Sequence, residues 1–501
     1  MSIGAKSDTA TSTKSEDLRK SSKNGAKKIK RKIIMWATCR RRILCLPAPD
    51  AVCGGRSGHR IVCVPHLSGG RGANSSSSSE TKEQCEFSSW LKRRGEHDPN
   101  TGLSIGLSPH GRGLFASRPI HTGECMLHVS HDLMITPEKL PEEVTKLLSK
   151  DVSAWAKLAL FLLAHQKKKE TSAWAPYISC LPPFGSMHST IFWTQDELVY
   201  LKVSPVYRET VQRKDVVRME FAAAENALLL CPHIFGSRVS ALEFKHAYAT
   251  VCSRAWGIET IKSLALVPFV DFFNHDANCR AMLSYDEDRH CAEVVSDRDY
   301  ATGDQVVISY GQLSNATLAL DFGFALPFNP HDQAGIWLSL SEKDPLRDSK
   351  LKLLHSHNMQ TCVTREGVDT AGSSFSLQEV KSKAGRGKGI PQTLRAFARV
   401  VCATTSEELD EMAKFAADTD GRLARRPSID KTKEHKAMTL LQTVIDNRIQ
   451  KHEQAALAIR DSAVLQKPRK EIAKAIVGGE LRVLRSASAW LKQHSQALLQ
   501  T

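Results

Sequence analysis

The sequence predicts an α+β fold in which a β-rich region contains an inserted helical block and is followed by a helical C-terminal domain. Short apolar runs separated by Gly, Pro, Asn and Asp fill residues 101–136, as in antiparallel strands. Apolar residues recur at helical spacing over residues 141–252 and again beyond residue 332. The 501 residues are 41% hydrophobic and 25% charged, which is an ordinary globular composition. This length predicts two or three domains.

The basic charge is concentrated at the N-terminus. Of a net charge of +15, residues 1–79 hold 16 basic and 4 acidic residues, which leaves 53 basic and 50 acidic residues for positions 80–501. A nucleic-acid-binding protein carries its basic surface on the folded domain, so nucleic acid is not the expected partner. The longest apolar run, Trp155 to Ala164, contains Lys157 and is shorter than the roughly 18 residues of a membrane span. We therefore expect no membrane association.

Residues 1–80 are expected to form a disordered basic tail. Within it, Lys27 to Lys32 reads KKIKRK, which is either a nuclear-import signal or a solvated run of charge. Residues 36–79 are rich in Arg and Ser and contain one acid, Asp50, a composition typical of an organelle transit peptide. Translation from Met35 would place that segment at the N-terminus of the product.

The thirteen cysteines are scattered and form no C-x-x-C pair. This spacing argues against a regular disulfide framework and against a thiolate zinc site. Unpaired cysteines of this kind indicate a reducing compartment.

The folded chain is expected to begin with a short amphipathic helix near Phe87, Trp90 and Leu91, followed by short strands. One turn occurs twice, at Arg118–Glu124 and at Arg298–Asp304. Each copy reads Thr-Gly-acid before an apolar strand, and glycine supplies the positive φ that such turns often need.

Helical spacing predicts helices in the inserted block and in the C-terminal domain. In the block, the spaced apolar residues are Leu147, Leu148, Val152, Trp155, Leu158 and Leu162. In the C-terminal domain they are Leu394, Phe397, Ala398, Val401, Leu441, Val444, Ile445, Leu481, Leu484, Ala487 and Leu491. The stretch Lys381–Gly389, rich in Gly, Lys and Ser, is expected to be a loop.

Three clusters of residues are candidates for chemistry, and each also has a purely structural interpretation. The closely spaced glycines of Gly111–Leu114 either let a ligand approach the backbone or form a hairpin turn. The segment Leu266–Asp276 ends a buried run in Asp271, Asn274, His275 and Asp276. Asp271 and His275 are four residues apart, but a metal needs three or four converging ligands. Asn274 and His275 could instead satisfy buried backbone groups.

The third cluster runs from Ile308 to Phe324 and contains Tyr310-Gly311 and Asp321-Phe322-Gly323-Phe324. A Tyr that ends a strand is usually a half-buried strand residue. In this order, however, the three clusters resemble the SET-domain protein methyltransferases, and in particular the plant family of the Rubisco large-subunit lysine methyltransferase. The resemblance extends from about Phe87 to the C-terminus. It includes further runs at Ser172–Tyr177, Leu181-Pro182, Ser253–Trp256 and Asn329-Pro330.

The resemblance implies a fold and a domain organisation. The SET-domain β-fold would occupy residues 87–332, with its helical insertion at about 141–252. Residues 333–501 would form an all-helical domain that binds the substrate. The implied partner is a folded protein, such as the Rubisco large subunit or another stromal enzyme, and the chain is expected to be a monomer. The implied location is the chloroplast, with the nucleus or cytoplasm as alternatives.

The resemblance also implies the cofactor, S-adenosylmethionine (SAM), and a role for each site residue. Arg112, Gly113 and Leu114 would line the cofactor through their backbone. Arg254 would pair with its carboxylate as a guanidinium fork does, while Asn274 and His275 would hold its amino acid and adenine portions.

The substrate side of the site is implied in the same way. Tyr310 would act at the methyl-transfer channel, and Asp271 and Phe322 would line the substrate side of that channel. No metal is required. The family usually has Tyr where this chain has Phe322, which leaves the number of methyl groups and the target side chain open. A protein-histidine methyltransferase and a non-catalytic binding module remain the alternatives.

Overall fold

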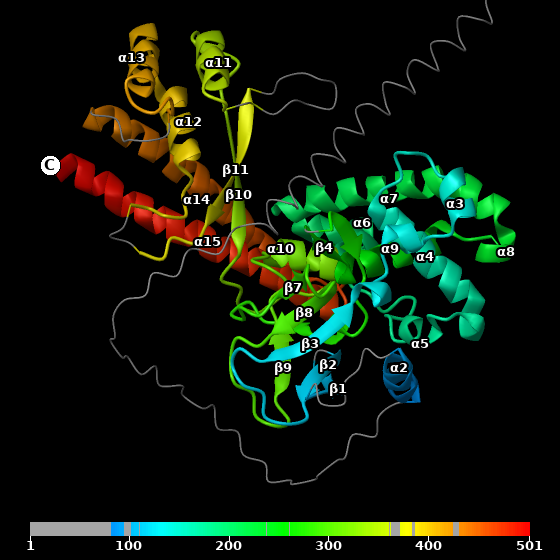
Figure 1. Cartoon of the computed structure of the whole chain (residues 1–501). Coiled ribbons are helices and arrows are strands. Elements are labelled where there is room, and N and C mark those ends of the chain that lie inside the picture. The colour runs from blue at the N-terminus through cyan, green and yellow to red at the C-terminus, as the bar shows by residue number, and fades with distance from the viewer. Residues whose placement is uncertain are drawn as a thin grey trace, which may run out of the picture. The chain divides into compact units, whose positions relative to one another are not determined.

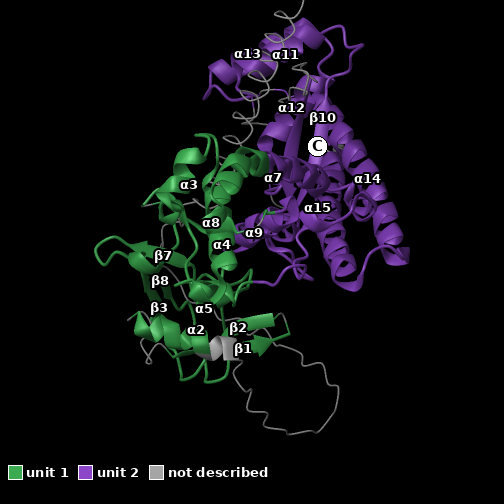
Figure 2. Ribbon diagram, turned by 90° about the vertical axis from the view of Figure 1, so that its right-hand side faces the viewer, with its two compact units in different colours: residues 1–181, 220–239, 255–311 green, residues 182–219, 240–254, 312–501 purple. Residues whose placement is uncertain are grey.

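The computed structural model describes residues 82–94, 102–109, 111–236, 238–259, 261–359, 361, 371–382, 386–423 and 430–500. The tail expected at 1–80, with its basic hexamer and its Arg- and Ser-rich segment, lies outside these residues. The described chain forms two compact units (Figure 2). Unit 1 takes the described residues of 1–181, 220–239 and 255–311, and unit 2 takes those of 182–219, 240–254 and 312–501.

Strands and helices follow one another in blocks, with α3 to α9 between β3 and β4 and with α12 to α15 after the last strand (Figure 1). The strands are β1 (Leu103–Ser108), β2 (Gly111–Ala116), β3 (Cys125–Ser130), β4 (Trp256–Ile258), β5 (Ser263–Ala265), β6 (Asn274–His275), β7 (Leu283–Asp286), β8 (Cys291–Val295), β9 (Gln305–Ile308), β10 (Gln333–Ser339) and β11 (Gly372–Gln378). The helices are α2 (Lys82–Arg93), α3 (Glu142–Leu147), α4 (Ala154–Lys168), α5 (Ala175–Ile178), α6 (Gln195–Leu198), α7 (Pro205–Leu230), α8 (Pro232–Phe235), α9 (Ala241–Arg254), α10 (Asn315–Thr317), α11 (Arg347–Ser356), α12 (Gln392–Cys402), α13 (Ser406–Ala417), α14 (Lys431–Asp461) and α15 (Lys467–Gln500), with the short turns η6 (Val270–Phe272) and η7 (Leu318–Phe322) among them.

Unit 1 contains small sheets whose strands come from both ends of its sequence. One sheet has the order β1-β2-β9-β6 and another the order β3-β8-β7. Strands β6 and β9 pair in parallel, with Asn274 opposite Val307, whereas β2 and β9 are antiparallel, with Leu114 opposite Val306. The strands expected at 101–136 are confirmed. Strand β9 therefore joins the early motif on β2 to the later motif on β6.

The repeated Thr-Gly-acid turn forms the same local structure twice. Gly123 and Gly303 have φ values of +85° and +91°, in the region that favours glycine. Glu124 accepts a hydrogen bond from the backbone N–H of His121 at 3.0 Å, and Asp304 accepts one from the N–H of Ala301 at 2.8 Å. In both copies the acidic residue closes the turn that precedes its strand.

The amphipathic helix expected near Phe87 is α2, and its apolar face is buried. Phe87 is fully buried and Trp90 and Leu91 are 5% and 2% exposed. The ring of Phe87 stacks on Phe269, with centroids 6.3 Å apart, and lies edge-on to Phe272 at 5.4 Å. This aromatic contact packs α2 against the segment that leads to β6.

The inserted block is helical, as expected, and it supplies α3 to α9. Ser153 caps α4 by accepting a hydrogen bond from the N–H of Ala156 at 3.2 Å, and Leu158 and Leu162 are fully buried. The block is divided between the two units, because residues 182–219 and 240–254 belong to unit 2.

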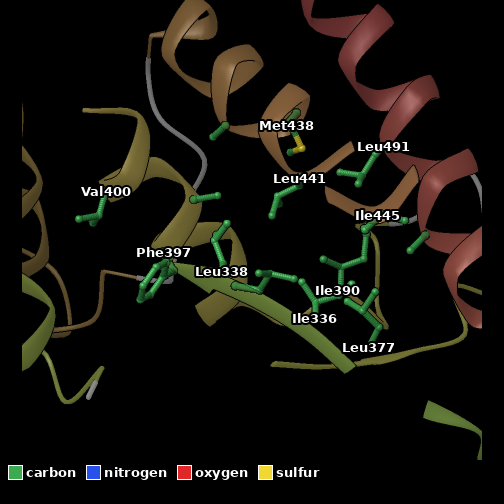
Figure 3. Packing of buried hydrophobic residues seen from close by; sticks show 14 of the residues in the cluster. Ile336, Leu338, Leu377, Ile390, Phe397, Val400, Met438, Leu441, Ile445 and Leu491 are labelled. Carbon is green, nitrogen blue, oxygen red and sulfur yellow. The ribbon is translucent and has the colours of Figure 1, made fainter. Parts of the chain in front are cut away.

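The C-terminal region is helical, as expected, but it is not all helix. Strands β10 and β11 form an antiparallel hairpin with Ile336 opposite Phe375. Ala334, Ile336 and Leu338 are buried while Trp337 between them is 41% exposed, which is the two-residue period of a strand with one buried face. The hairpin packs on α12, α14 and α15, where Phe397, Leu441 and Leu491 complete the core (Figure 3). Among the helices of the described residues, none combines the length and apolar character needed to cross a membrane.

Candidate functional site

The strand order of unit 1 brings the first two clusters of the sequence together. The side-chain Nδ2 of Asn274 on β6 donates to the carbonyl of Arg112 on β2 at 3.2 Å. The backbone N–H of Tyr310, which follows β9, donates to Nδ1 of His275 at 3.1 Å. Asn274 and His275 therefore satisfy backbone groups and at the same time fix the positions of the other two motifs.

Gly113 has no room for a side chain. A Cβ atom at this position would lie 2.6 Å from Nε2 of Gln305 and 2.9 Å from Nδ2 of Asn274. The neighbouring Gly111 has a φ of +99° and lies opposite Ser108 where the β1–β2 hairpin closes. The two glycines thus have different roles, because Gly111 serves the turn and Gly113 permits a close approach.

Two buried donors lie in this part of unit 1. Nη1 of Arg112 and Nε2 of Gln305 are buried and have no hydrogen-bond partner among the described residues. A buried donor without a partner is unfavourable by about 1–3 kcal/mol, so such donors indicate a place for an acceptor. The guanidinium of Arg112 also lies 6.0 Å from the centroid of the Phe272 ring.

The sequence did not single out Gln305. It is the first residue of β9, directly after the second Thr-Gly-acid turn, and lies opposite Phe115 of β2. Its place beside Gly113 depends on the pairing of strands that are far apart in the sequence. The one available signal was its position immediately after the repeated turn.

Tyr310 is held in a fixed orientation by three contacts. Its hydroxyl donates to the carbonyl of Phe273 at 2.6 Å. Its ring stacks on His275, with centroids 5.1 Å apart and an interplanar angle of 23°, and lies edge-on to Trp256 at 6.0 Å. The side chain is half-buried. The hydroxyl proton is engaged by the carbonyl, which fixes the direction of the hydroxyl oxygen.

Asp271 lies in η6 and is tied to the helical part of unit 1. Its Oδ2 accepts a hydrogen bond from the hydroxyl of the fully buried Tyr177 at 2.5 Å. Phe269, two residues earlier, is 2% exposed and has a φ of +77°, a strained conformation for a residue other than glycine. Among the described residues, no group of three or more His, Cys, Asp or Glu side chains could hold a metal ion.

The segment after His275 holds the end of β9 in place. The N–H of Asp276 donates to the carbonyl of Ile308 at 3.0 Å, and the N–H of Ser309 donates to that of Ala281 at 2.8 Å. Burial raises the pKa of the Cys279 thiol to about 11, so Cys279 is a neutral thiol near pH 7 and not a nucleophile.

Arg254 and Phe322 belong to unit 2. Arg254 is the last residue of α9 and is half-buried, and its Nη1 donates to Oγ of the adjacent Ser253 at 2.6 Å. Phe322 ends the π-helical turn η7, and its ring lies edge-on to Phe324 at 6.2 Å. The sequence-predicted residues therefore form two groups, one in each unit: Arg112, Gly113, Leu114, Asp271, Asn274, His275 and Tyr310 in unit 1, and Arg254 and Phe322 in unit 2.

A buried ion pair fixes the turn that carries Phe322. Nη1 of Arg213 on α7 lies 2.9 Å from Oδ1 of Asp321, and both side chains are 4% exposed. Burial alone would lower the pKa of Arg213, but the Asp321 carboxylate raises it, so the guanidinium stays charged. Gly323 ends the turn at a φ of +82°, and a Cβ atom there would lie 2.7 Å from the backbone nitrogen of Ser189. Arg213 could not be selected from the sequence, since a basic residue in a long helix is usually solvated.

Comparisons with known proteins agree with this arrangement. The sequence pattern of the SET domain matches residues 111–311, and that of the Rubisco LSMT substrate-binding domain matches residues 341–484. The chain resembles the ribulose-1,5 bisphosphate carboxylase/oxygenase large subunit N-methyltransferase of Nicotiana tabacum, with 31% identity over 54% of this chain and 57% of the relative. It also resembles the fructose-bisphosphate aldolase-lysine N-methyltransferase of Arabidopsis thaliana, with 31% identity over 57% and 61%.

The actin-histidine N-methyltransferase of Homo sapiens is 29% identical over 61% of this chain and 50% of that protein. The chain thus spans about three fifths of the length of the two plant relatives and half of the human one. Among solved structures, Rubisco LSMT bound to sinefungin and monomethyllysine has the same fold, with a TM-score of 0.66 over 84% of this chain and 94% of that one, at 24% identity.

Proposed function

We infer that the chain transfers methyl groups from SAM to a lysine side chain of a folded protein, since residues 111–311 match the SET domain and residues 341–484 match the Rubisco LSMT substrate-binding domain. The observation that carries this proposal is the fixed hydroxyl of Tyr310. It is held by Phe273 beside the His275 ring, in the same unit as the Gly113 position and its buried donors.

The residues present fit SAM. The buried donors of Arg112 and of Gln305, whose Nε2 lies against Gly113, suit a ligand rich in acceptors, which the carboxylate and ribose oxygens of SAM provide. We assign Arg112, Gly113, Leu114, Asn274, His275 and Arg254 to its binding. When bound, SAM supplies a methyl group activated on a sulfonium.

The protein's contribution to this reaction is positioning and removal of water. The Tyr310 oxygen is fixed by its bond to Phe273, so its lone pairs can make weak C–H···O contacts to a polarised methyl group. A free lysine has a pKa of about 10.4, and an apolar channel lowers it toward the neutral amine that attacks. We place Phe322 and Asp271 on the substrate side of that channel.

The substrate class follows from the relatives. The two plant relatives are named for the Rubisco large subunit and for fructose-bisphosphate aldolase, so we propose a folded enzyme of this kind. The test incubates the chain with labelled SAM and, separately, Rubisco, aldolase and a stromal extract, followed by mass spectrometry of labelled peptides. Label on lysine supports the proposal. A chain that binds SAM and labels no protein would indicate a non-catalytic binding module.

Arg254 is expected to act in SAM binding. Replacing Arg254 with Ala should weaken SAM by about 2 kcal/mol, or roughly 30-fold, because a charged hydrogen bond is lost. Arg254→Lys keeps the charge but loses the planar fork, and an intermediate affinity is expected. Isothermal calorimetry measures both variants. Unchanged affinity in Arg254→Ala would remove Arg254 from the cofactor site.

Phe322 is expected to favour successive methylation, since it lacks the hydroxyl that a Tyr would offer to the amine. The wild-type product should be mainly di- or trimethyllysine. Phe322→Tyr should shift the products toward lower methylation, with ratios changed about 5- to 30-fold, the effect of a hydrogen bond of 1–2 kcal/mol. Mass spectrometry of the modified peptide measures the ratio. As a control, Phe324→Tyr adds the same hydroxyl to the neighbouring ring and should leave the product ratio unchanged. A wild-type product that stops at monomethyllysine would contradict the prediction.

Histidine is the second candidate target. The similarity to the actin-histidine methyltransferase and the missing hydroxyl at Phe322 favour it over other side chains. The same peptide spectra separate the two targets, because the modified residue is identified directly.

We propose the chloroplast as the location, which the names of the plant relatives support. A fluorescent fusion of the full chain should enter plastids, whereas a fusion of residues 80–501 should stay in the cytoplasm. Nuclear accumulation of the full-length fusion would instead assign the basic hexamer Lys27–Lys32 as an import signal.

A further inference from the structure

The basic segment between β11 and α12 has no part in the proposed methyl transfer. Its described residues Lys381, Arg386 and Lys388 line a hollow of about 440 Å³ within unit 2. Asp332 and Glu379 line the same hollow, as does the amide side chain of Gln333. The three cations are exposed, whereas Asp332 is only 3% exposed. The hollow therefore has acidic groups inside and a basic rim.

The two ends of this segment are fixed by the surrounding fold. The N–H of Val380 donates to Oγ of Ser486 at 2.9 Å, and the N–H of Gln378 donates to the carbonyl of Gly389 at 2.8 Å. Gly389 has a φ of +124°, and a Cβ atom there would lie 2.6 Å from the carbonyl oxygen of Gln378. Nη2 of Arg395 donates to the carbonyl of Arg386 at 2.9 Å. The backbone that carries the cations is thus held at the hollow.

The acidic groups of the hollow already have a cationic partner. Arg482 lies 3.3 Å from Asp332 and 3.3 Å from Glu379, and it donates to the carbonyl of Asn329 at 2.6 Å. Within the part of the chain that the structure describes, Lys381, Arg386 and Lys388 make no ion pair. The charge of the rim is therefore available to an external anion.

We propose that this hollow docks an acidic peptide segment of the protein substrate, an inference that rests on the proposed function. Carboxylates of the segment would meet the three rim cations, and its backbone amides would meet Gln333 and the carboxylates inside. A nucleic acid fits less well, because its phosphates would face Asp332 and Glu379, and His331 is the one aromatic ring among the described residues that line the hollow. Docking here would raise affinity for the protein substrate without touching the reacting amine.

The binding test uses fluorescein-labelled peptides and fluorescence anisotropy at low salt. The probes are a twelve-residue Glu-Gly repeat, a Ser-Gly repeat of equal length and a twelve-residue oligothymidylate. The full chain should bind the acidic peptide and not the neutral one, and added salt should weaken the binding. The triple variant Lys381→Glu, Arg386→Glu, Lys388→Glu should bind the acidic peptide at least 10-fold more weakly.

A matched control variant distinguishes binding at this hollow from attraction of the peptide by the overall charge of the protein. Lys352, Lys414 and Lys451 are exposed lysines of unit 2 outside the hollow, and their triple reversal to Glu changes the net charge equally. This control should bind the peptide within 2-fold of wild type. A triple Gln variant of the rim should show an intermediate loss, so the result does not depend on the folding of the reversal variant. Equal losses in rim and control variants, or an oligothymidylate bound more tightly than the peptide, would overturn the proposal.

An enzymatic comparison separates this proposal from the proposed function. In the rim variant, SAM affinity and kcat should be unchanged while KM for the protein substrate rises about 10-fold. An unchanged KM would refute docking here and leave the methyltransferase assignment intact. If the wild-type chain methylated no protein, the proposed function would fail, and the peptide-binding comparison would still decide whether the hollow is an anionic peptide site.

Discussion

Replacing Tyr310 with Phe is expected to slow methyl transfer at least about 100-fold, which corresponds to roughly 2.7 kcal/mol of activation free energy, while SAM affinity stays within a few-fold. The ring contacts with His275 and Trp256 do not involve the hydroxyl, so the variant should keep the shape of the site. What it loses is the oxygen that Phe273 holds at 2.6 Å. Single-turnover rates with labelled SAM measure the chemical step, and calorimetry measures the affinity.

Tyr300 provides a matched control for this variant. It is 6% exposed, lies in the same unit, and its hydroxyl also donates to a backbone carbonyl, that of Val307, at 3.4 Å. Tyr300→Phe removes the same group close to β9 but outside the candidate site, and the rate should change less than about 3-fold. A normal rate in Tyr310→Phe would show that its hydroxyl has no part in the reaction.

The features that could be predicted from the sequence are those whose backbone conformation is decided by residues close together in the chain. Gly123 and Gly303 follow from the turn that each residue must make. Helices α14 and α15 could be predicted because each buries one face, so its apolar residues recur at helical spacing. The resemblance selected Asn274, His275 and Tyr310, and hydrogen bonds join Asn274 to Arg112 and Tyr310 to His275 in unit 1.

The features that the sequence could not supply depend on distant pairing. The β10–β11 hairpin is an example, because Gln333–Ser339 pairs with Gly372–Gln378 across an intervening helix, α11. Gln305 becomes relevant only when β9 aligns with β2, where it covers Gly113. Arg213 and Asp321 are 108 residues apart in the sequence. Nothing in the sequence around either residue indicates that the two form an ion pair.

The Arg213–Asp321 pair gives the largest expected effect on stability. Replacing Asp321 with Asn should lower the free energy of unfolding by roughly 3–5 kcal/mol, because a guanidinium that is 4% exposed loses its counter-charge. Thermal and urea unfolding measure the loss. The exposed pair of Glu142 and Lys146, whose side chains are 82% and 71% exposed, is the control, and Glu142→Gln should change stability by less than about 1 kcal/mol.

A double variant separates the stability of this pair from its effect on the site. Arg213→Met with Asp321→Leu removes both charges, and apolar side chains of similar volume should restore most of the lost stability. Asp321 precedes Phe322 in the π-helical turn, however, and Arg213 also donates to Sγ of Cys252 on α9 at 3.5 Å. The pair therefore joins α7, α9 and η7 and orients the turn that carries Phe322. A stable double variant with a changed ratio of methylated products would establish that positioning role. Wild-type product ratios in that variant would show that the pair contributes to stability alone.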